Sequence, residues 1–541
     1  MRARQTVVGP GTLMSWLTLS RVLVGLYIFV FSMVCIYGLH RYQLVYLYYR
    51  YRKGRPRITR RFKCLPRVTV QLPMYNERYV ARRIIELACQ IDYPRDLLQI
   101  QVLDDSTDDT TEVAREAVEH MRRAGHDVVY LHRDNRAGYK AGALEEGLKT
   151  ATGEFVCIFD ADFLPPPEII RQTIDYFTDE HVGMVQARWE HLNRDHSLLT
   201  KTQAVLLDGH FVIEHGARSR SGRFMSFNGT AGIWRISCIR DAGGWQHDTL
   251  TEDLDLSYRA QLRGWRFLFL PDLSSSAELP PEMEAFKAQQ YRWAKGGAQT
   301  CRKLLPRILR SRLPLKIKWE AFFHLTSCTV YLYMVVLTLL LFPVLYMSVG
   351  VPKHTTLAGA LLDLSLFLVA TCSASSFYAA SQRELFRTWF ESVKYLPFLM
   401  ALGVGISLNN ARAALSGFSG KASEFVRTPK FGVLRSNDQG WKRRQAYRKK
   451  RPLRLQPCIE VGMGVYLGAC VVLCVESHSI SIGLPFLALF SVGYLYVGVT
   501  SLLAEWLRRT TGAAEQTTEN PANADPEIPL VSTEPVRSTR E

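Results

Sequence analysis

The sequence has no pair of cysteines spaced Cys-X-X-Cys and no metal-ligand spacing of cysteine and histidine. Its 11 cysteines are scattered over 541 residues, and several fall within apolar runs. Scattered cysteines of this kind behave as small buried residues, whereas a disulfide framework requires paired, regular spacing. We therefore expect a reducing compartment and no disulfide framework.

Two nucleotide-binding motifs are also missing, namely Gly-X-Gly-X-X-Gly and Gly-X-X-X-X-Gly-Lys-Ser/Thr. Their absence argues against a Rossmann oxidoreductase and against a P-loop nucleotidase. The first apolar segment, near residues 22–39, is followed by no small-residue cleavage site. It is therefore predicted to be a retained membrane anchor rather than a cleaved signal peptide.

Long apolar runs dominate the C-terminal half of the chain. Several reach the roughly 18–20 residues that cross a bilayer, and they carry apolar residues on every face. A soluble core would not accommodate such helices, so we expect a multi-pass protein of the cell membrane. The apolar segments lie near residues 22–39, 321–345, 357–379, 393–410, 457–475 and 483–506.

The net charge of +17 is concentrated beside these apolar segments. The stretch from Arg50 to Arg67 contains nine Lys or Arg residues and no acid. Positive charge next to a membrane helix marks the cytoplasmic side and favours anionic lipid headgroups. We therefore expect contact with the lipid bilayer and no binding of nucleic acid.

Residues 67–310 are charged and alternate between strand-like and helix-like segments, which predicts a parallel α/β sheet. Ligands of such sheets bind beyond the carboxyl ends of the strands. Three of the predicted strands end in "YNE", "DDS" and "DAD", so carboxylates are expected to gather at one edge. The predicted strands cover 67–74, 97–105, 127–133 and 154–162, and the helices cover 77–90, 110–125 and 140–153.

Asp160 and Asp162 flank one residue at the end of a predicted strand, so both side chains should point to the same side. Two such carboxylates favour Mg²⁺ or Mn²⁺, shared with substrate phosphates. A solvated turn explains the pair equally well. Asp104 and Asp105 end another strand, and an N-cap cluster is the plain alternative for the acids that follow them.

Lys140 opens a predicted helix, where a cation is unfavourable unless an anion such as phosphate binds there. The alternative is a lysine that faces solvent. Arg292 and Trp293, in "QQYRWAKGG", could hold a diphosphate and stack on a sugar ring. An amphipathic helix with a buried tryptophan is the simpler interpretation of that stretch.

The stretch "TEDLDLSYRAQLRGWRF" begins with Thr251, Glu252 and Asp253. These residues are typical of a helix N-terminus, with a capping threonine and acids in the first turn. A carboxylate there could also act as a general base toward a substrate hydroxyl.

In this order, NE, DDS, KAG, DAD, TED and QxxRW between two membrane blocks resemble the processive family-2 glycosyltransferases, such as cellulose, hyaluronan and chitin synthases. The resemblance runs from about residue 67 to 510. The local sequences are most similar to those of bacterial relatives of the plant cellulose-synthase-like A and C proteins. These plant proteins make β-1,4-mannan, glucomannan or a β-glucan backbone. It implies an α/β, GT-A-type nucleotide-sugar transferase domain inserted between transmembrane helices.

The resemblance also implies roles for the matching residues, toward a nucleoside-diphosphate sugar donor and a growing glycan acceptor. The catalytic group would be Thr251, Glu252 and the base Asp253. The donor would contact Asp104, Asp105, Lys140, Asp160 and Arg292, the metal Asp160 and Asp162, and the acceptor Gln289, Trp293, Phe227 and Gly229.

The stretch "SEFVRTPKFG" resembles the gating loop FxVTxK of cellulose synthase. Phe425, Thr428 and Lys430 match it, and Arg427 replaces the family valine. The resemblance implies that Thr428 and Lys430 approach the donor diphosphate. The alternative is a cytoplasmic flank, since Arg427 to Arg454 holds eleven Lys or Arg residues, and both interpretations can hold together.

Composition and motifs together predict seven regions. They are an N-terminal anchor (1–50), a basic cytoplasmic flank (51–66), a cytoplasmic catalytic domain (67–310), interfacial and transmembrane helices (311–412), an amphipathic helix with the gating-loop-like segment and basic flank (413–456), a transmembrane helix pair (457–508) and a disordered tail (509–541).

The function that the resemblance implies is an inverting, membrane-embedded enzyme that polymerises a β-linked glycan from GDP-mannose or UDP-glucose and translocates it. A non-processive transferase that moves one sugar to a lipid is an alternative. A receptor or transporter with an inactive transferase-like domain is another, against which the full set of acids argues. The donor, the linkage and any accessory subunit are left open by the sequence.

A gating loop must lie on the same side of the membrane as the catalytic domain, so an even number of crossings must separate them. Three apolar segments lie between, and we expect the short segment 393–410 to be re-entrant or interfacial, because it runs into the amphipathic "NNARAALSGF". Cysteine-accessibility labelling should therefore find residues 381–390 and 425–450 on the same face. Labelling on opposite faces would reject either this arrangement or the gating loop.

Overall fold

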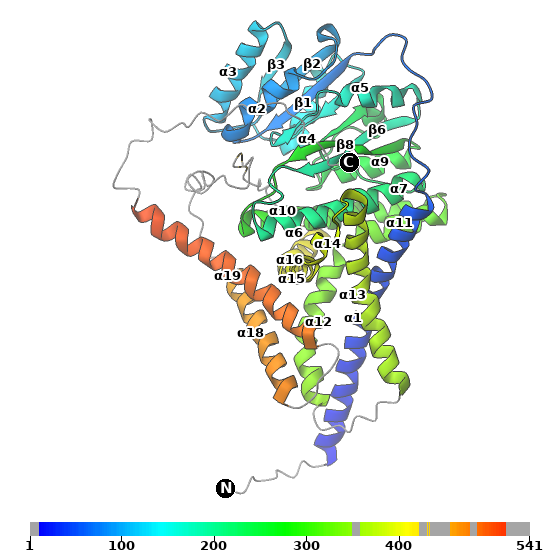
Figure 1. Ribbon diagram of the computed structural model, residues 1–541, viewed down its shortest axis with the longest axis vertical. Coiled ribbons are helices and arrows are strands. Elements are labelled where there is room, and N and C mark those ends of the chain that lie inside the picture. The colour runs from blue at the N-terminus through cyan, green and yellow to red at the C-terminus, as the bar shows by residue number, and fades with distance from the viewer. Residues whose placement is uncertain are drawn as a thin grey trace.

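The computed structural model describes residues 10–348, 357–420, 430, 432, 455–476 and 484–514. An α/β domain stands on a group of long helices that come from both ends of the chain (Figure 1). Helix α1 (Pro10–Arg50) precedes this domain, and α18 (Leu455–Glu476) and α19 (Leu484–Ala514) follow it. The predicted insertion of an α/β domain between apolar helices is confirmed.

A single sheet of eight strands in the order β3-β2-β1-β4-β7-β6-β8-β5 forms the centre of the α/β domain. The four strands predicted from the sequence pair in parallel, but β7 runs antiparallel to both β4 and β6. The sheet is therefore mixed, and the expectation of a parallel sheet holds only for its first half. The strands are β1 (Val68–Met74), β2 (Leu98–Asp104), β3 (Asp127–His132), β4 (Phe155–Ile158), β5 (Phe163–Leu164), β6 (Val182–His191), β7 (Gly232–Arg235) and β8 (Arg266–Ala277).

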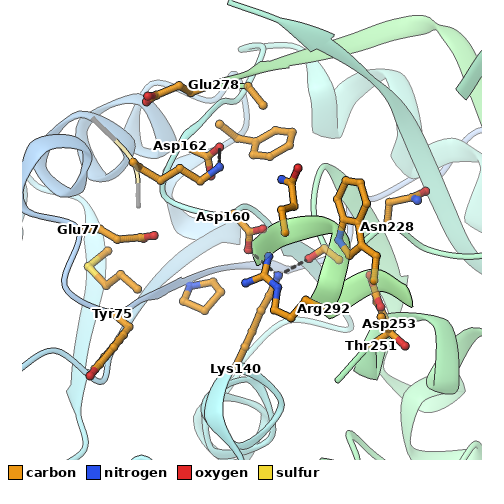
Figure 2. Close-up of a pocket in the computed structure, with 18 of the residues that line it drawn as sticks. Tyr75, Glu77, Lys140, Asp160, Asp162, Asn228, Thr251, Asp253, Glu278 and Arg292 are labelled. Carbon is orange, nitrogen blue, oxygen red and sulfur yellow. Dashed lines mark hydrogen bonds and ion pairs between the residues drawn. The ribbon is translucent and has the colours of Figure 1, made fainter. Parts of the chain in front are cut away.

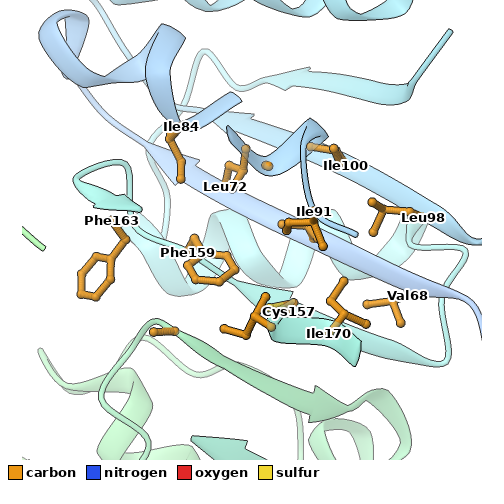
Figure 3. Packing of buried hydrophobic residues seen from close by; sticks show 14 of the residues in the cluster. Val68, Leu72, Ile84, Ile91, Leu98, Ile100, Cys157, Phe159, Phe163 and Ile170 are labelled. Atoms are coloured by element: carbon orange, nitrogen blue, oxygen red, sulfur yellow. The ribbon is translucent and has the colours of Figure 1, made fainter. Parts of the chain in front are cut away.

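Strand β1 is buried on both faces, as expected for a central parallel strand. Val68 and Leu72 belong to a core cluster that also contains Ile84 of α2 (Arg78–Cys89) (Figure 3). On the other face, Gln71 donates a hydrogen bond to Gln101 Oε1 at 3.0 Å beneath α4 (Tyr139–Thr150). Strand β1 is thereby held in register, and its carboxyl end is fixed at the edge of the sheet.

The remaining helices of the α/β domain cover the two faces of the sheet and lead down to the apolar helices (Figure 1). One continuous helical segment between β6 and β7 consists of α6 (Leu198–Asp208), a π-helical stretch (Gly209–His215) and α7 (Gly216–Arg220). The others are α3 (Thr110–Arg123), α5 (Ile169–Thr173), α8 (Ile236–Asp241), α9 (Glu252–Leu262), α10 (Met283–Arg310) and α11 (Leu315–Thr326).

Three described helical segments are long and apolar enough to cross a membrane, namely Thr18–Arg50, Leu455–Glu476 and Leu487–Leu507. Two bent pairs raise the number to as many as five in the described part of the chain. One pair joins α11 to α12 (Thr329–Ser348) with a bend of 55°, and the other bends by 45° between Phe390–Gly405 and Ser407–Phe418. Helix α13 (Leu357–Leu385) stands beside α1.

The segment 393–410 is broken into the short helices α14 (Phe390–Val393), α15 (Leu396–Gly405) and α16 (Ser407–Phe418). They lie directly beneath α10 and α6 (Figure 1). This bent geometry is that of a broken span or a re-entrant loop. The re-entrant assignment stays a prediction.

Two further expectations concern the chain boundaries and the cysteines. Helix α19 continues to Ala514, beyond the expected end at residue 508, and the rest of the predicted tail lies outside the described residues. All eleven cysteines are free, as expected from their spacing.

A buried ion pair ties the C-terminal helices to the α/β domain. Lys287 of α10 places its Nζ 2.8 Å from Glu460 Oε2 of α18, and neither side chain is open to solvent. Ser501 of α19 accepts a second hydrogen bond from the same Nζ at 3.3 Å. Losing one member of a buried pair leaves an uncompensated charge, so this contact fixes where α10 meets the apolar helices.

The approach of α15 to α19 depends on glycine. A Cβ atom at Gly405 would lie 2.3 Å from the carbonyl oxygen of Gly493, whereas one at Gly403 would meet nothing within 4 Å. We expect Gly405→Ala to destabilise the protein by ~1–3 kcal/mol through overpacking. Gly403→Ala, on the same helix, should be neutral or stabilising by up to ~1 kcal/mol. Thermal unfolding of the detergent-purified variants measures the difference, and equal stabilities would contradict this contact.

Candidate active site

An open cleft of about 1220 Å³ lies at the carboxyl edge of β1, β2 and β4. Its other walls come from the start of α4, the loop before β7, the start of α9 and the first half of α10 (Figure 2). Most of the residues predicted to act on substrate line this one cleft. They are Asp105, Lys140, Asp160, Asp162, Gly229, Thr251, Glu252, Asp253, Gln289, Arg292, Trp293 and Lys430.

Asp104 and Asp105 have different surroundings although they are neighbours. Asp104 is fully buried and accepts hydrogen bonds from the Ser106 amide at 2.9 Å and the Tyr130 hydroxyl at 2.7 Å. It supports the end of β2 and does not line the cleft. Asp105 does line it, and Arg133 holds its two carboxylate oxygens at 2.7 and 2.5 Å.

Lys140 connects three segments of the cleft. Its Nζ lies 2.5 Å from Asp160 Oδ1 and 2.8 Å from the carbonyl oxygen of Gly229. Burial alone would lower the pKa of Lys140, but the nearby carboxylates of Asp160 and Glu252 outweigh burial and raise the pKa. Lys140 is therefore a cation at the N-terminus of α4, where it faces the cleft rather than bulk solvent.

The two acids of the DAD sequence point into the cleft, as their spacing predicts. Strand β4 ends at Ile158, earlier than the predicted strand 154–162, so both acids lie in the turn that follows it. Phe159 and Ala161 pack in the hydrophobic core, whereas Asp160 and Asp162 line the cleft. Asp162 lies 2.5 Å from the Nζ of Lys430.

Lys430 and Gly432 are the described part of the gating-loop-like segment, and both contact the cleft region. The Gly432 amide donates to Glu278 Oε2 at 2.9 Å, and Glu278 itself lines the cleft. Thr428, the other residue predicted for the donor, lies outside the described residues. Sequence reasoning missed Glu278, because no motif singles out the acid of "SAELPPE".

Asp253 and Glu252 begin α9 and line the cleft, and Asp253 lies on the side opposite Glu77 (Figure 2). Burial, reinforced by Glu252, raises the pKa of Asp253 to about 7, although Lys140 opposes this rise. Burial also raises the pKa of Glu252. A carboxyl group that titrates near neutral pH is suited to take a proton from a hydroxyl.

Helix α10 carries the QxxRW residues along the cleft. Gly296, one turn beyond Trp293, allows the close approach, since a Cβ there would lie 2.5 Å from Thr251 Cγ2. Gln289, Arg292 and Trp293 therefore face the cleft beside the start of α9. An arginine, an indole ring and a buried carboxylate in one cleft can hold a diphosphate, a sugar ring and a hydroxyl.

Phe227, expected at the acceptor site, lies in the hydrophobic core instead. It is 1% exposed and packs edge-on against Trp234, with ring centroids 5.5 Å apart. Its backbone amide donates to Ser257 Oγ at 2.8 Å, and Ser257 donates to the carbonyl of Asp253 at 2.6 Å. Phe227 thus positions the loop, and the next residue, Asn228, is the one that reaches the cleft.

Gly229 takes a left-handed backbone conformation, with φ of 81°, directly beside the base candidate. A Cβ at this position would lie 3.1 Å from Asp253 Oδ2 and 3.3 Å from Lys140 Nζ. Glycine is needed here both for its backbone and for the space it leaves.

Comparison with known proteins identifies the family. A family model described as "Glycosyltransferase like family 2" matches residues 66–296. Glucomannan 4-beta-mannosyltransferase 2 from Arabidopsis thaliana is 39% identical over 430 residues, which cover 75% of each chain. The chain belongs to glycosyltransferase family 2.

Glucomannan 4-beta-mannosyltransferase 9 from Arabidopsis thaliana is 35% identical to this glycosyltransferase over 415 residues, or 74% of each chain. The solved structure of mannosyltransferase PcManGT from Pyrobaculum calidifontis, in complex with GDP-Man and Mn2+, is 20% identical with a TM-score of 0.48. That match covers 73% of this chain and 100% of the other.

An ionised Asp253 is required if it accepts the proton of the acceptor hydroxyl. Because its pKa is raised to about 7, the group is protonated below this pH, and we expect the rate of glycosyl transfer to rise with pH through about 7 and then level off. Initial rates of glycosyl transfer, measured at pH values on both sides of about 7, test this expected pH dependence. As a control, Asp253→Asn should lower transfer by at least ~100-fold while nucleotide binding persists. A flat profile for the native enzyme, or an active Asp253→Asn variant, would contradict this role.

Proposed function

We propose that this glycosyltransferase polymerises a β-1,4-linked mannan or glucomannan backbone from GDP-mannose at the cytoplasmic face of a membrane. The observation that carries the proposal is the 39% identity to a glucomannan 4-beta-mannosyltransferase over 430 residues. The 430 aligned residues exceed the length of the region 66–296 that matches the family model. The alignment therefore includes apolar helices as well as the catalytic region.

The chemistry of the cleft fits inverting transfer by one displacement. Asp253 takes the proton of the acceptor hydroxyl, whose oxygen attacks the anomeric carbon as the bond to the diphosphate breaks. An α-linked donor then gives a β-linked product, and no second carboxylate nucleophile is required. Lys140 and Arg292 stabilise the negative charge that builds on the leaving diphosphate.

The carboxylates of Asp160 and Asp162 fit a hard divalent cation. Both carboxylates line the cleft. Lys140 Nζ lies 2.5 Å from Asp160 and Lys430 Nζ lies 2.5 Å from Asp162, so each carboxylate attracts a positive charge. Among the described residues, no group of three or more potential protein ligands is arranged around a metal, so donor oxygens would complete the shell. Mg²⁺ or Mn²⁺ held by Asp160 and Asp162 would neutralise charge on the diphosphate.

The acceptor side is proposed to lie along α10, where Trp293 offers a flat apolar face to a sugar ring and Gln289 lies one turn away. The described apolar helices begin immediately beneath α10 (Figure 1). A chain extended at this position would leave the cleft toward the membrane helices, which supports translocation of the product. Lys430, which lies against Asp162, is proposed to contact the donor diphosphate.

The experiment is a donor screen with analysis of product size and linkage. Purified enzyme in lipid nanodiscs, supplied with radiolabelled GDP-mannose and Mg²⁺ or Mn²⁺, should form a long polymer that β-1,4-mannanase degrades. UDP-glucose alone should give little product. The Asp253→Asn variant is the matched inactive control. A single-sugar product soluble in organic solvent, or a polymer made from UDP-glucose alone, would overturn the proposal.

A further inference from the structure

The π-helical stretch Gly209–His215 places an unusual set of side chains behind the cleft. In an α-helix, residues five apart lie on different faces, but here the rings of His210 and His215 meet with centroids 4.6 Å apart. Single π-helical turns inside longer helices often occur at functional sites. The stretch follows α6 and continues into α7, so the change of pitch is confined to this one place.

Apolar helices hold this stretch from one side. A Cβ at Gly209 would lie 2.7 Å from the ring of Phe377 in α13, and one at Gly216 would lie 2.8 Å from the ring of Tyr48 in α1. Val212 and Ile213 join the same hydrophobic cluster. The π-helical stretch is thus anchored on α1 and α13, and its polar residues face the other way.

A chain of buried and partly buried polar contacts runs from α1 to His210. His40 lies 3.1 Å from Glu320 Oε2, whose other oxygen accepts from Arg218 Nε at 2.9 Å. Arg218 Nη1 donates to Glu214 Oε2 at 3.2 Å, and this oxygen lies 2.9 Å from His210 Nδ1. Although burial opposes it, the charges of Arg218 and then His210 hold the pKa of Glu214 well below its usual value.

This arrangement fixes the tautomer of His210. An ionised Glu214 can only accept, so Nδ1 of His210 carries the proton and Nε2 of the neutral ring is an acceptor. The Asn228 amide nitrogen lies 3.0 Å from that Nε2 and donates to it, and His215 Nε2 lies 3.1 Å from the same atom. Because Asn228 donates this hydrogen bond, its Nδ2 is turned toward His210 and its Oδ1 is turned away from it.

Asn228 lines the cleft on the side of Asp253 and Thr251, across from Asp160 and Asp162 (Figure 2). The residue that follows it, Gly229, lies next to the Asp253 carboxylate. Within the described chain, Asn228 Oδ1 is buried and has no hydrogen-bond partner. A buried acceptor without a partner is unfavourable, and a sugar hydroxyl would satisfy it.

We propose that His210, oriented by Glu214, is a positioning residue that turns Asn228 Oδ1 toward a hydroxyl of the acceptor sugar beside Asp253. This inference rests on the proposed function, since it requires a glycan acceptor in the cleft. The acceptor is favoured over the donor because Asn228 lies with the base candidate, whereas the carboxylates suited to a metal and diphosphate lie opposite. His210 touches neither substrate and acts through Asn228.

The test compares His210→Leu with His210→Gln in the polymerisation assay, with a soluble β-1,4-manno-oligosaccharide as the acceptor. His210→Leu removes the hydrogen bond and should raise the half-saturating acceptor concentration up to ~10-fold. It should also increase hydrolysis of GDP-mannose relative to transfer. His210→Gln keeps an acceptor group and should recover most of the loss. The dissociation constant for GDP should stay unchanged in both variants, which also shows that they fold.

A double-mutant cycle with Asn228→Ala separates positioning from general packing. If His210 acts through Asn228, the effect of His210→Leu on the acceptor should disappear once Asn228 is alanine. His181→Leu, at an exposed histidine remote from the cleft, is the matched control and should behave as the native enzyme. Additive effects, or equal losses in GDP binding and acceptor use, would overturn the inference. A native enzyme that forms no polymer would instead reject the proposed function.

Discussion

The ion pair between Lys140 and Asp160 holds together the three chain segments that make the cleft. Lys140 comes from the start of α4, Asp160 from the turn just after β4, and the carbonyl of Gly229 from the loop before β7. Gly229 in turn lies against Asp253, so the position of the base candidate depends on the same cation. A shift of any one segment would break contacts to the other two.

The burial that organises these charges also sets their chemistry. Burial and Glu252 raise the pKa of Asp253 toward neutrality, while Lys140 pulls it back, and the result is a carboxyl group that titrates at about 7. The carboxylates of the cleft keep Lys140 protonated in spite of its burial. In the proposed reaction, this one compact set of opposed charges would supply both a proton acceptor and a cation for the leaving diphosphate.

Helix α10 and the π-helical stretch connect this chemistry to the apolar helices by two independent routes. Helix α10 touches Thr251 through Gly296 at one point and Glu460 through Lys287 at another, so a single rigid helix spans the cleft and the C-terminal helices. The π-helical stretch reaches the cleft through His210 and packs on α1 and α13. The positions of the cleft residues therefore depend on contacts with the apolar helices at both places.

The sequence by itself determined that several strands are followed by acids and that these acids gather at one edge of the sheet, because the carboxyl ends of parallel strands meet at a common edge. Tertiary structure decided the rest. In the loop before the antiparallel β7, Phe227 lies in the core and Asn228 lines the cleft, and Arg133, just after β3, reaches Asp105 at the end of the neighbouring β2. These outcomes depend on which distant segments pack together, and no local pattern in the chain records that.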